Sequence, residues 1–101
     1  MLPSITPTTG AGNRAIVTVI GHDQVGIIAA VATMLARAQV NILDISQSIM
    51  QEFFVMIMMV DLANSNSGFD ALKGELNARG ESMGLKIDIQ REDVFKLMHR
   101  V

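Results

Sequence analysis

The spacing of hydrophobic and polar positions changes along the chain, and the first two segments show the clearest patterns. Residues 14–20 form a β-branched run that is apolar on both sets of alternate positions, as is typical of a central strand. From residue 27 to about residue 39, apolar residues recur at the three- and four-residue spacing of an amphipathic helix. The pattern predicts a strand that leads into a helix through the glycine-containing turn 21–26.

The middle of the chain predicts a hairpin. Residues 41–50 alternate loosely between apolar and polar side chains, and residues 53–61 are an almost uninterrupted apolar run. Gln51 and Glu52 separate the two segments, which indicates a tight turn between two strands.

A second helix is expected over residues 69–83, with Asn66 or Ser67 as its N-cap and Gly84 just after its end. Its buried face would consist of four hydrophobic residues: Phe69, Leu72, Leu76 and Met83. The charged side chains of this helix, such as Lys73, Glu75 and Arg79, are most simply a solvated face.

The order of elements defines the expected fold. Residues 85–90 alternate strictly, as in an edge strand with one wet face, and residues 92–99 predict a short last helix. The order β-α-β-β-α-β predicts an α+β, ferredoxin-like sandwich: an antiparallel four-stranded sheet with two helices on one face, plus the C-terminal helix. Residues 1–13 hold both prolines without periodicity, so we expect a flexible N-terminal arm followed by a single domain over residues 14–101.

The strand at residues 53–61 is apolar on both faces, whereas two helices can cover only one face of the sheet. The second face needs a cover, either another subunit or the apolar side of the C-terminal helix. That side carries four hydrophobic residues: Val94, Phe95, Leu97 and Met98. We therefore expect a homodimer or a higher homo-oligomer.

Composition excludes several classes of protein. Only 4% of the residues are aromatic and the net charge is −2, which argues against a nucleic-acid partner. The chain has no cysteine, which excludes disulfides and thiolate metal sites and fits a cytoplasmic location. The longest apolar run is far shorter than the roughly 20 residues that cross a bilayer, so no membrane partner is expected.

Metal binding, cofactors and catalysis are not indicated. His22 and His99 are the only histidines, are far apart in the sequence, and have no carboxylate at metal-ligand spacing. The eight methionines are better explained by core packing than by a soft-metal site. There is no Gly-x-Ser-x-Gly motif, and the acylphosphatase alternative on this fold needs an arginine that the turn 21–26 lacks.

The turn 21–26 is the strongest candidate for chemistry. Its glycines allow close approach of another molecule, and the first amides of the following helix lack internal partners. Structural roles remain open beside this one, because Asp23 is also expected as the N-cap of the helix and Gly26 can serve close packing. Asn41 is equally typical of a loop that ends in a strand.

The segment Gly21-His22-Asp23-Gln24-Val25-Gly26-Ile27 is followed, after the helix, by Val40-Asn41-Ile42 at the start of the next strand. With these motifs the chain resembles an ACT domain, a small βαββαβ module attached to amino-acid biosynthetic enzymes and regulators, over about residues 15–91. The ending Gln90-Arg91-Glu92-Asp93-Val94-Phe95 resembles a small stand-alone ACT family of bacteria and archaea.

The resemblance implies association and ligand binding rather than catalysis. ACT domains commonly pair side by side and bind small amino acids where the first turn of one copy meets the second strand of its partner. Carried over by position, one wall of the pocket is Asp23, Gln24, Val25, Gly26 and Ile27, and the other is Asn41 with the backbone of Ile42. Serine-sensing members often have a histidine where this chain has Gly21 and an asparagine where it has Asp23. The charged Asp23 favours an ammonium or hydroxyl donor on the ligand.

The sequence thus predicts a non-catalytic regulatory or sensor domain that binds a small amino acid or related metabolite at a dimer interface. The alternative is a ligand-free interaction module that docks a partner enzyme with the same surface. We expect no enzyme activity, no metal and no cofactor.

Overall fold

The computed structural model describes residues 13–98, and residues 1–12 and 99–101 lie outside the described part. Most of the predicted N-terminal arm and the end of the predicted last helix, His99, therefore fall outside it. The elements follow the predicted order: β1 (Arg14–His22), α2 (Ile27–Arg37), β2 (Asn41–Met50), β3 (Phe53–Asp61), α3 (Phe69–Met83), β4 (Leu85–Arg91) and α4 (Glu92–Met98). The predicted ferredoxin-like α+β fold is confirmed.

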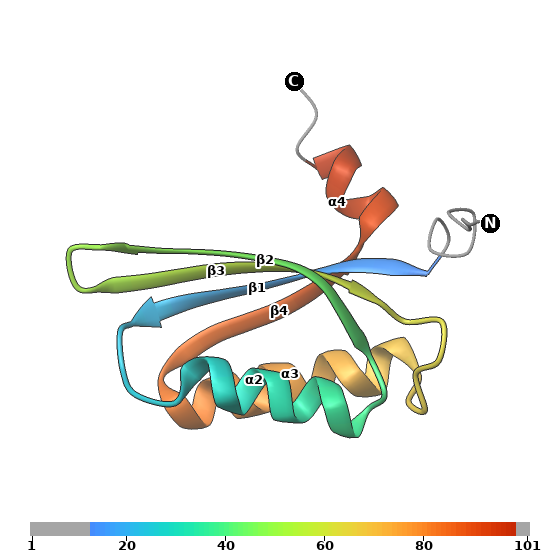
Figure 1. The fold of residues 1–101 in the computed structure, drawn as a ribbon, viewed down its shortest axis with the longest axis horizontal. Helices are drawn as coiled ribbons and strands as arrows, with labels where there is room; N and C mark the ends of the chain where they lie inside the picture. Colours follow the sequence, from blue (N-terminus) through green and yellow to red (C-terminus); the bar gives the residue numbers. More distant parts are fainter. Residues whose placement is uncertain (1–12, 99–101) are drawn as a thin grey trace.

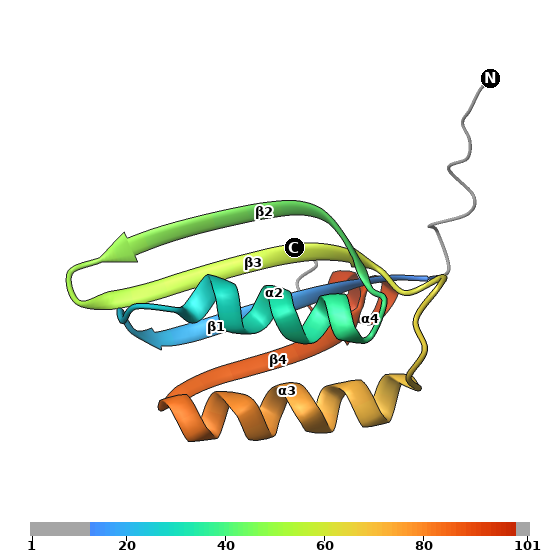
Figure 2. The ribbon, with the colours of Figure 1, turned by 60° about the horizontal axis from the view of Figure 1, so that its bottom comes forward.

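The four strands form one antiparallel sheet in the order β2-β3-β1-β4. β1 is central and β4 is an edge strand, as the alternation of each segment predicts. α2 and α3 cover one face of the sheet, and α4 lies on the opposite side (Figures 1 and 2).

The core lies between the sheet and the two long helices. Alternate residues of β1, β3 and β4 point toward the helices, which direct the apolar stripes Ile27/Val31/Leu35 and Leu72/Leu76 back at them. The strand residues of this core are Ala15, Val17, Val19, Phe54, Met56, Met58, Val60, Leu85, Ile87 and Ile89. Methionines therefore fill the middle of the core, where their flexible side chains suit irregular gaps.

The predicted helix starts need correction. Asp23 is not the N-cap of α2, because β1 continues to His22 and the helix begins only after Gly26, a left-handed residue with φ 92°. No side chain caps this helix start. The N-cap of α3 is Gly68 rather than Asn66 or Ser67. Asn66 Nδ2 instead donates to the Arg37 carbonyl at the end of α2, and Ser67 Oγ donates to Asn66 Oδ1.

Two helix ends also bear on the sequence interpretation. The predicted end at Gly84 is confirmed, with φ 73° in the left-handed conformation that favours glycine. α2 stops at Arg37 instead of near residue 39, because Gln39 takes a positive φ of 58° and turns the chain into β2.

The face of the sheet away from α2 and α3 is only partly covered. α4 contacts β1 and β4, and Ile16 beneath it is buried. Further along this face, Phe53 and Ile57 are each 43% exposed, and Ile20 is also exposed. Within residues 13–98, the C-terminal helix therefore covers one end of the face and leaves the rest of it open.

A two-armed ion pair holds α4 in place. The Arg14 Nε donates a 3.1 Å bond to Glu92 Oε1, and Arg14 Nη2 bonds Glu92 Oε2. These bonds lower the pKa of the Glu92 carboxyl below its ordinary value, against the opposing effect of its burial. Glu92 is the first residue of α4, so the pair fixes the helix at its start.

Candidate functional site

The turn between β1 and α2 is an exposed loop with free hydrogen-bonding groups. The side chains of Asp23, Gln24 and Val25 are exposed, and Val25 is fully so. The Asp23 amide donates a 2.9 Å bond to the Glu52 carbonyl, which holds the turn against the β2–β3 hairpin. The fixed turn presents the uncapped first amides of α2 at its end.

The correction of the N-cap changes the role of Asp23. Among residues 13–98, its carboxylate has no hydrogen-bond or ion-pair partner, whereas a cap would be bonded to the helix amides. An exposed, unpaired carboxylate next to unpaired amides can bind a molecule that carries both a cationic and an anionic group.

Gln24 and Ile27 have structural roles. Gln24 Nε2 donates to the Met83 carbonyl at 3.0 Å, so this side chain ties the turn to the last turn of α3. Ile27 is 2% exposed and belongs to the core, so only its backbone amide faces the turn. Of the five predicted residues in this wall, Asp23, Val25 and Gly26 are the ones whose groups remain free to meet another molecule.

Asn41 and Ile42 do not lie near this turn within one chain. Asn41 pairs with Asp61 at one end of the sheet, whereas Met50, Phe53 and His22 lie together at the other end, where the turn begins. The ten residues from Asn41 to Met50 span about 30 Å of strand. A single copy therefore does not bring the two predicted walls together.

Asn41 instead lines a polar cleft of about 420 Å³ at its own end of the sheet. Gln39, Asp61 and Asn64 also line this cleft, which makes it rich in amide and carboxylate groups. Ile42 pairs with Val60, and its half-buried side chain packs against the core.

The two edges of the sheet differ in access. Side chains of α3 cover the β4 edge: Asn77 Nδ2 donates to the Ile87 carbonyl at 2.6 Å and Lys73 Nζ donates to the Ile89 carbonyl at 3.1 Å. Lys73 also bonds Asp88 Oδ1 at 2.5 Å. Burial opposes ionisation of Asp88, but the bonds from Lys73 and the Ile89 amide bring its pKa below the ordinary value.

Sequence reasoning missed this role of α3. Lys73 and Asn77 are four residues apart and so share one face of the helix, and this spacing was the available signal. The charges of α3 predict a solvated face, because nothing in the sequence shows that a strand edge lies against it.

The β2 edge, by contrast, has no neighbouring strand or helix side chain bonded to it within residues 13–98. β2 is ten residues long, and four of its hydrophobic side chains are exposed: Leu43, Ile45, Ile49 and Met50. A long, exposed and apolar edge strand is a surface on which another strand can pair.

The fold is a ferredoxin-like sandwich in which a glycine turn joins the central strand to the first helix. The second strand is open at the edge of the sheet. Together these features define a small ACT-type domain. The ACT domain family model matches residues 13–90, and the chain belongs to this family.

Its relatives are small proteins that align with this chain over almost their whole length. A UPF0237 protein of Clostridium acetobutylicum is 54% identical over 88 residues, which cover 87% of this chain and 99% of that protein. A UPF0237 protein of the archaeon Methanocaldococcus jannaschii is 48% identical over 89 residues, 88% of this chain and 99% of that protein. An ACT domain protein from Streptococcus pneumoniae superimposes with a TM-score of 0.73 at 36% identity, over 84% of this chain and 96% of that one. The predicted membership of a small ACT family of bacteria and archaea is confirmed.

None of the helices among residues 13–98 is both long enough and apolar enough to span a membrane.

Proposed function

We propose that this protein is a non-catalytic, cytoplasmic sensor that binds a small amino acid or related metabolite where two copies meet. The observation that carries the proposal is the unpaired Asp23 carboxylate beside the uncapped amides of α2. Its membership of the ACT family supports this function over others available to the fold.

The chemistry of the turn matches an amino-acid zwitterion. The amides at the start of α2 are suited to the ligand carboxylate, because the positive end of the helix dipole and the free N–H groups act together. The Asp23 carboxylate is suited to the ammonium group and keeps the ligand carboxylate away from its own side of the turn. The ligand therefore has a preferred direction in the site.

Pairing through β2 would supply the second wall. Antiparallel pairing of two β2 edges about a two-fold axis between Ile45 and Ser46 places Asn41 of the second copy opposite Met50. Met50 lies at the end of the sheet that holds the first turn, since it pairs with Phe53 and Phe53 pairs with His22. Asn41 and the Ile42 backbone of the second copy would then approach Asp23 and Gly26.

The alternative function is a ligand-free interaction module, and Val25 favours it. A fully exposed valine beside the half-exposed Ile28 is an apolar knob that a partner enzyme could bury. Ligand titration distinguishes the two functions, because docking of a partner on an apolar side chain does not depend on the charge of Asp23.

The test is a thermal-shift and calorimetric screen of the amino acids with the whole chain. A ligand at 100 times its dissociation constant raises the stability of the folded state by about 2.7 kcal/mol. Asp23→Asn should weaken binding of the ligand found, and the matched control Asp70→Asn, an exposed acidic residue in the first turn of α3, should not. A screen without a stabilising amino acid, or equal binding by wild type and Asp23→Asn, contradicts the proposal.

A further inference from the structure

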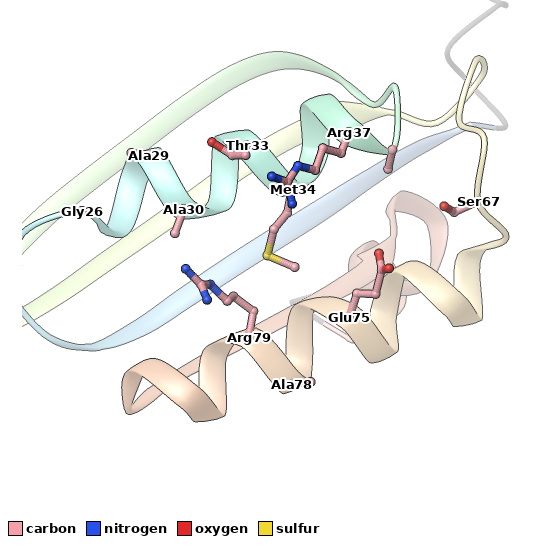
Figure 3. Close-up of a pocket in the computed structure, with 11 residues that line it drawn as sticks. Gly26, Ala29, Ala30, Thr33, Met34, Arg37, Ser67, Glu75, Ala78 and Arg79 are labelled. Atoms are coloured by element: carbon pink, nitrogen blue, oxygen red, sulfur yellow. The ribbon is translucent and has the colours of Figure 1, made fainter.

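A groove of about 870 Å³ runs between α2 and α3, away from the β2 edge (Figure 3). Small and apolar side chains line much of it: Ala29, Ala30 and Met34 from α2, and Ala78 from α3. Small side chains let the backbone of a bound partner come close to both helices. Gly26, at one end of the groove, is the point where it meets the first turn.

α2 has an unusual solvent-facing side for a surface helix. Its eleven residues include one charged side chain, Arg37, in the last turn. α3 carries charges along its whole length, as a water-facing helix normally does. Apart from Arg37, the wall that α2 gives to the groove is uncharged and rich in alanine, which is the composition of a surface that another protein covers.

The groove also has an electrostatic preference. Arg37 on α2 and Arg79 on α3 extend toward the space between the helices (Figure 3). Neither guanidinium has a hydrogen-bond or ion-pair partner among the residues that the structure describes. Glu75 is the one carboxylate in the lining, so two cations face one anion on a chain whose net charge is −2. Guanidinium groups in this position favour carboxylates, which they can bind with two parallel bonds.

We propose that the groove between α2 and α3 docks an acidic amphipathic helix of a partner protein. The apolar stripe of that helix would lie on the alanines and Met34, and its carboxylates would bond Arg37 and Arg79. A small metabolite fits less well, because the groove is open along the two helices and would leave much of such a ligand in water. The groove touches the proposed ligand site only at Gly26, and the two arginines that would bind the partner helix lie outside that site.

The test is selection from a displayed library of helical peptides of about 20 residues, long enough to hold a helix, against the whole chain. The proposal expects binders with an apolar stripe and acidic residues beside it, and chemical-shift changes at Ala29, Thr33 and Ala78. Arg37→Glu and Arg79→Glu should each weaken the selected peptide about tenfold or more, as for loss of a charge-assisted contact. Lys86→Glu makes the same charge change on exposed β4 outside the groove and should leave binding unchanged.

A peptide in which lysine replaces the acidic residue should restore binding to Arg79→Glu, and this rescue excludes a general loss of folding. The proposal is overturned if no acidic helix binds, if the binders map to another face, or if Lys86→Glu weakens them as much as Arg79→Glu. It is also overturned if the arginine variants change only the oligomeric state, because the groove would then belong to a contact between copies.

Discussion

Gly80 packs closely against the backbone of β4, and replacing it tests how tightly α3 packs on that strand. A Cβ at position 80 would lie 2.9 Å from the Leu85 carbonyl oxygen and 3.0 Å from the Ile87 amide nitrogen. Both atoms are backbone, so neither can rotate away and the helix itself would have to move. Gly74, in the same helix, has nothing within 4 Å of such a Cβ.

Replacing glycine by alanine should change the stability of the chain in opposite directions at the two positions. Replacing glycine by alanine inside a helix stabilises by about 0.5–1 kcal/mol, and Gly74→Ala should show this gain. Gly80→Ala has the same gain, but overpacking costs about 1–3 kcal/mol, and contact with backbone favours the upper end. The net loss is therefore about 1–2 kcal/mol, and the two variants should differ by about 2–3 kcal/mol.

The assay is urea denaturation followed by circular dichroism, with thermal melts as a check. At about 4–8 °C per kcal/mol for a domain of this size, the two melting temperatures should differ by roughly 10–20 °C. Gly74→Ala controls for helix propensity. Equal stability of the two variants would refute the close packing of α3 on β4.

Three further outcomes are expected. Met56→Asp should unfold the chain, because Met56 is completely buried, whereas Ile57→Asp should leave the chain folded, because Ile57 is 43% exposed. A folded Met56→Asp variant or an unfolded Ile57→Asp variant by circular dichroism would contradict this. Since its pKa is lowered in the folded state, Glu92 stabilises above the ordinary carboxyl pKa of about 4.3 and this contribution is lost as the pH falls through the lowered value. Glu92→Gln should therefore be less stable at neutral pH and less sensitive to acid, and identical stability-against-pH curves would count against the Arg14 pair. Gly26→Ala should cost about 1–2 kcal/mol in chemical denaturation despite the open space around it, because φ is 92° there; an unchanged stability would mean that the turn is not left-handed.

The periodicity of the sequence is enough to predict the fold, because each segment follows one spacing throughout. Strict alternation in residues 85–90 identifies an edge strand, and two apolar faces in residues 14–20 identify a central one. The helix starts were harder to predict. Asp23 has the chemistry of an N-cap, but pairing of His22 with Phe53 extends β1, and the chain then needs a left-handed residue, Gly26, to enter α2.

The candidate site could be predicted in part. The first turn follows from glycines next to a helix start, which is local information. The position of Asn41 is not local, because it depends on the register of β2 on β3, and this register places Asn41 at the far end of the sheet from Asp23. The covered β4 edge and the groove between the helices depend on contacts between elements far apart in the chain.

The central claim is that one binding site is built from the first turn of one copy and the β2 strand of another, and complementation tests it most directly. Asp23→Ala and Asn41→Ala should each abolish binding of the amino acid found in the screen, because each damages both sites of its own dimer. When equal amounts are unfolded together and refolded, half of the dimers are mixed and hold one intact site each, so about one quarter of all sites should bind with wild-type affinity in calorimetry. No recovery on mixing would contradict the account, because a site contained within one chain stays damaged in either variant.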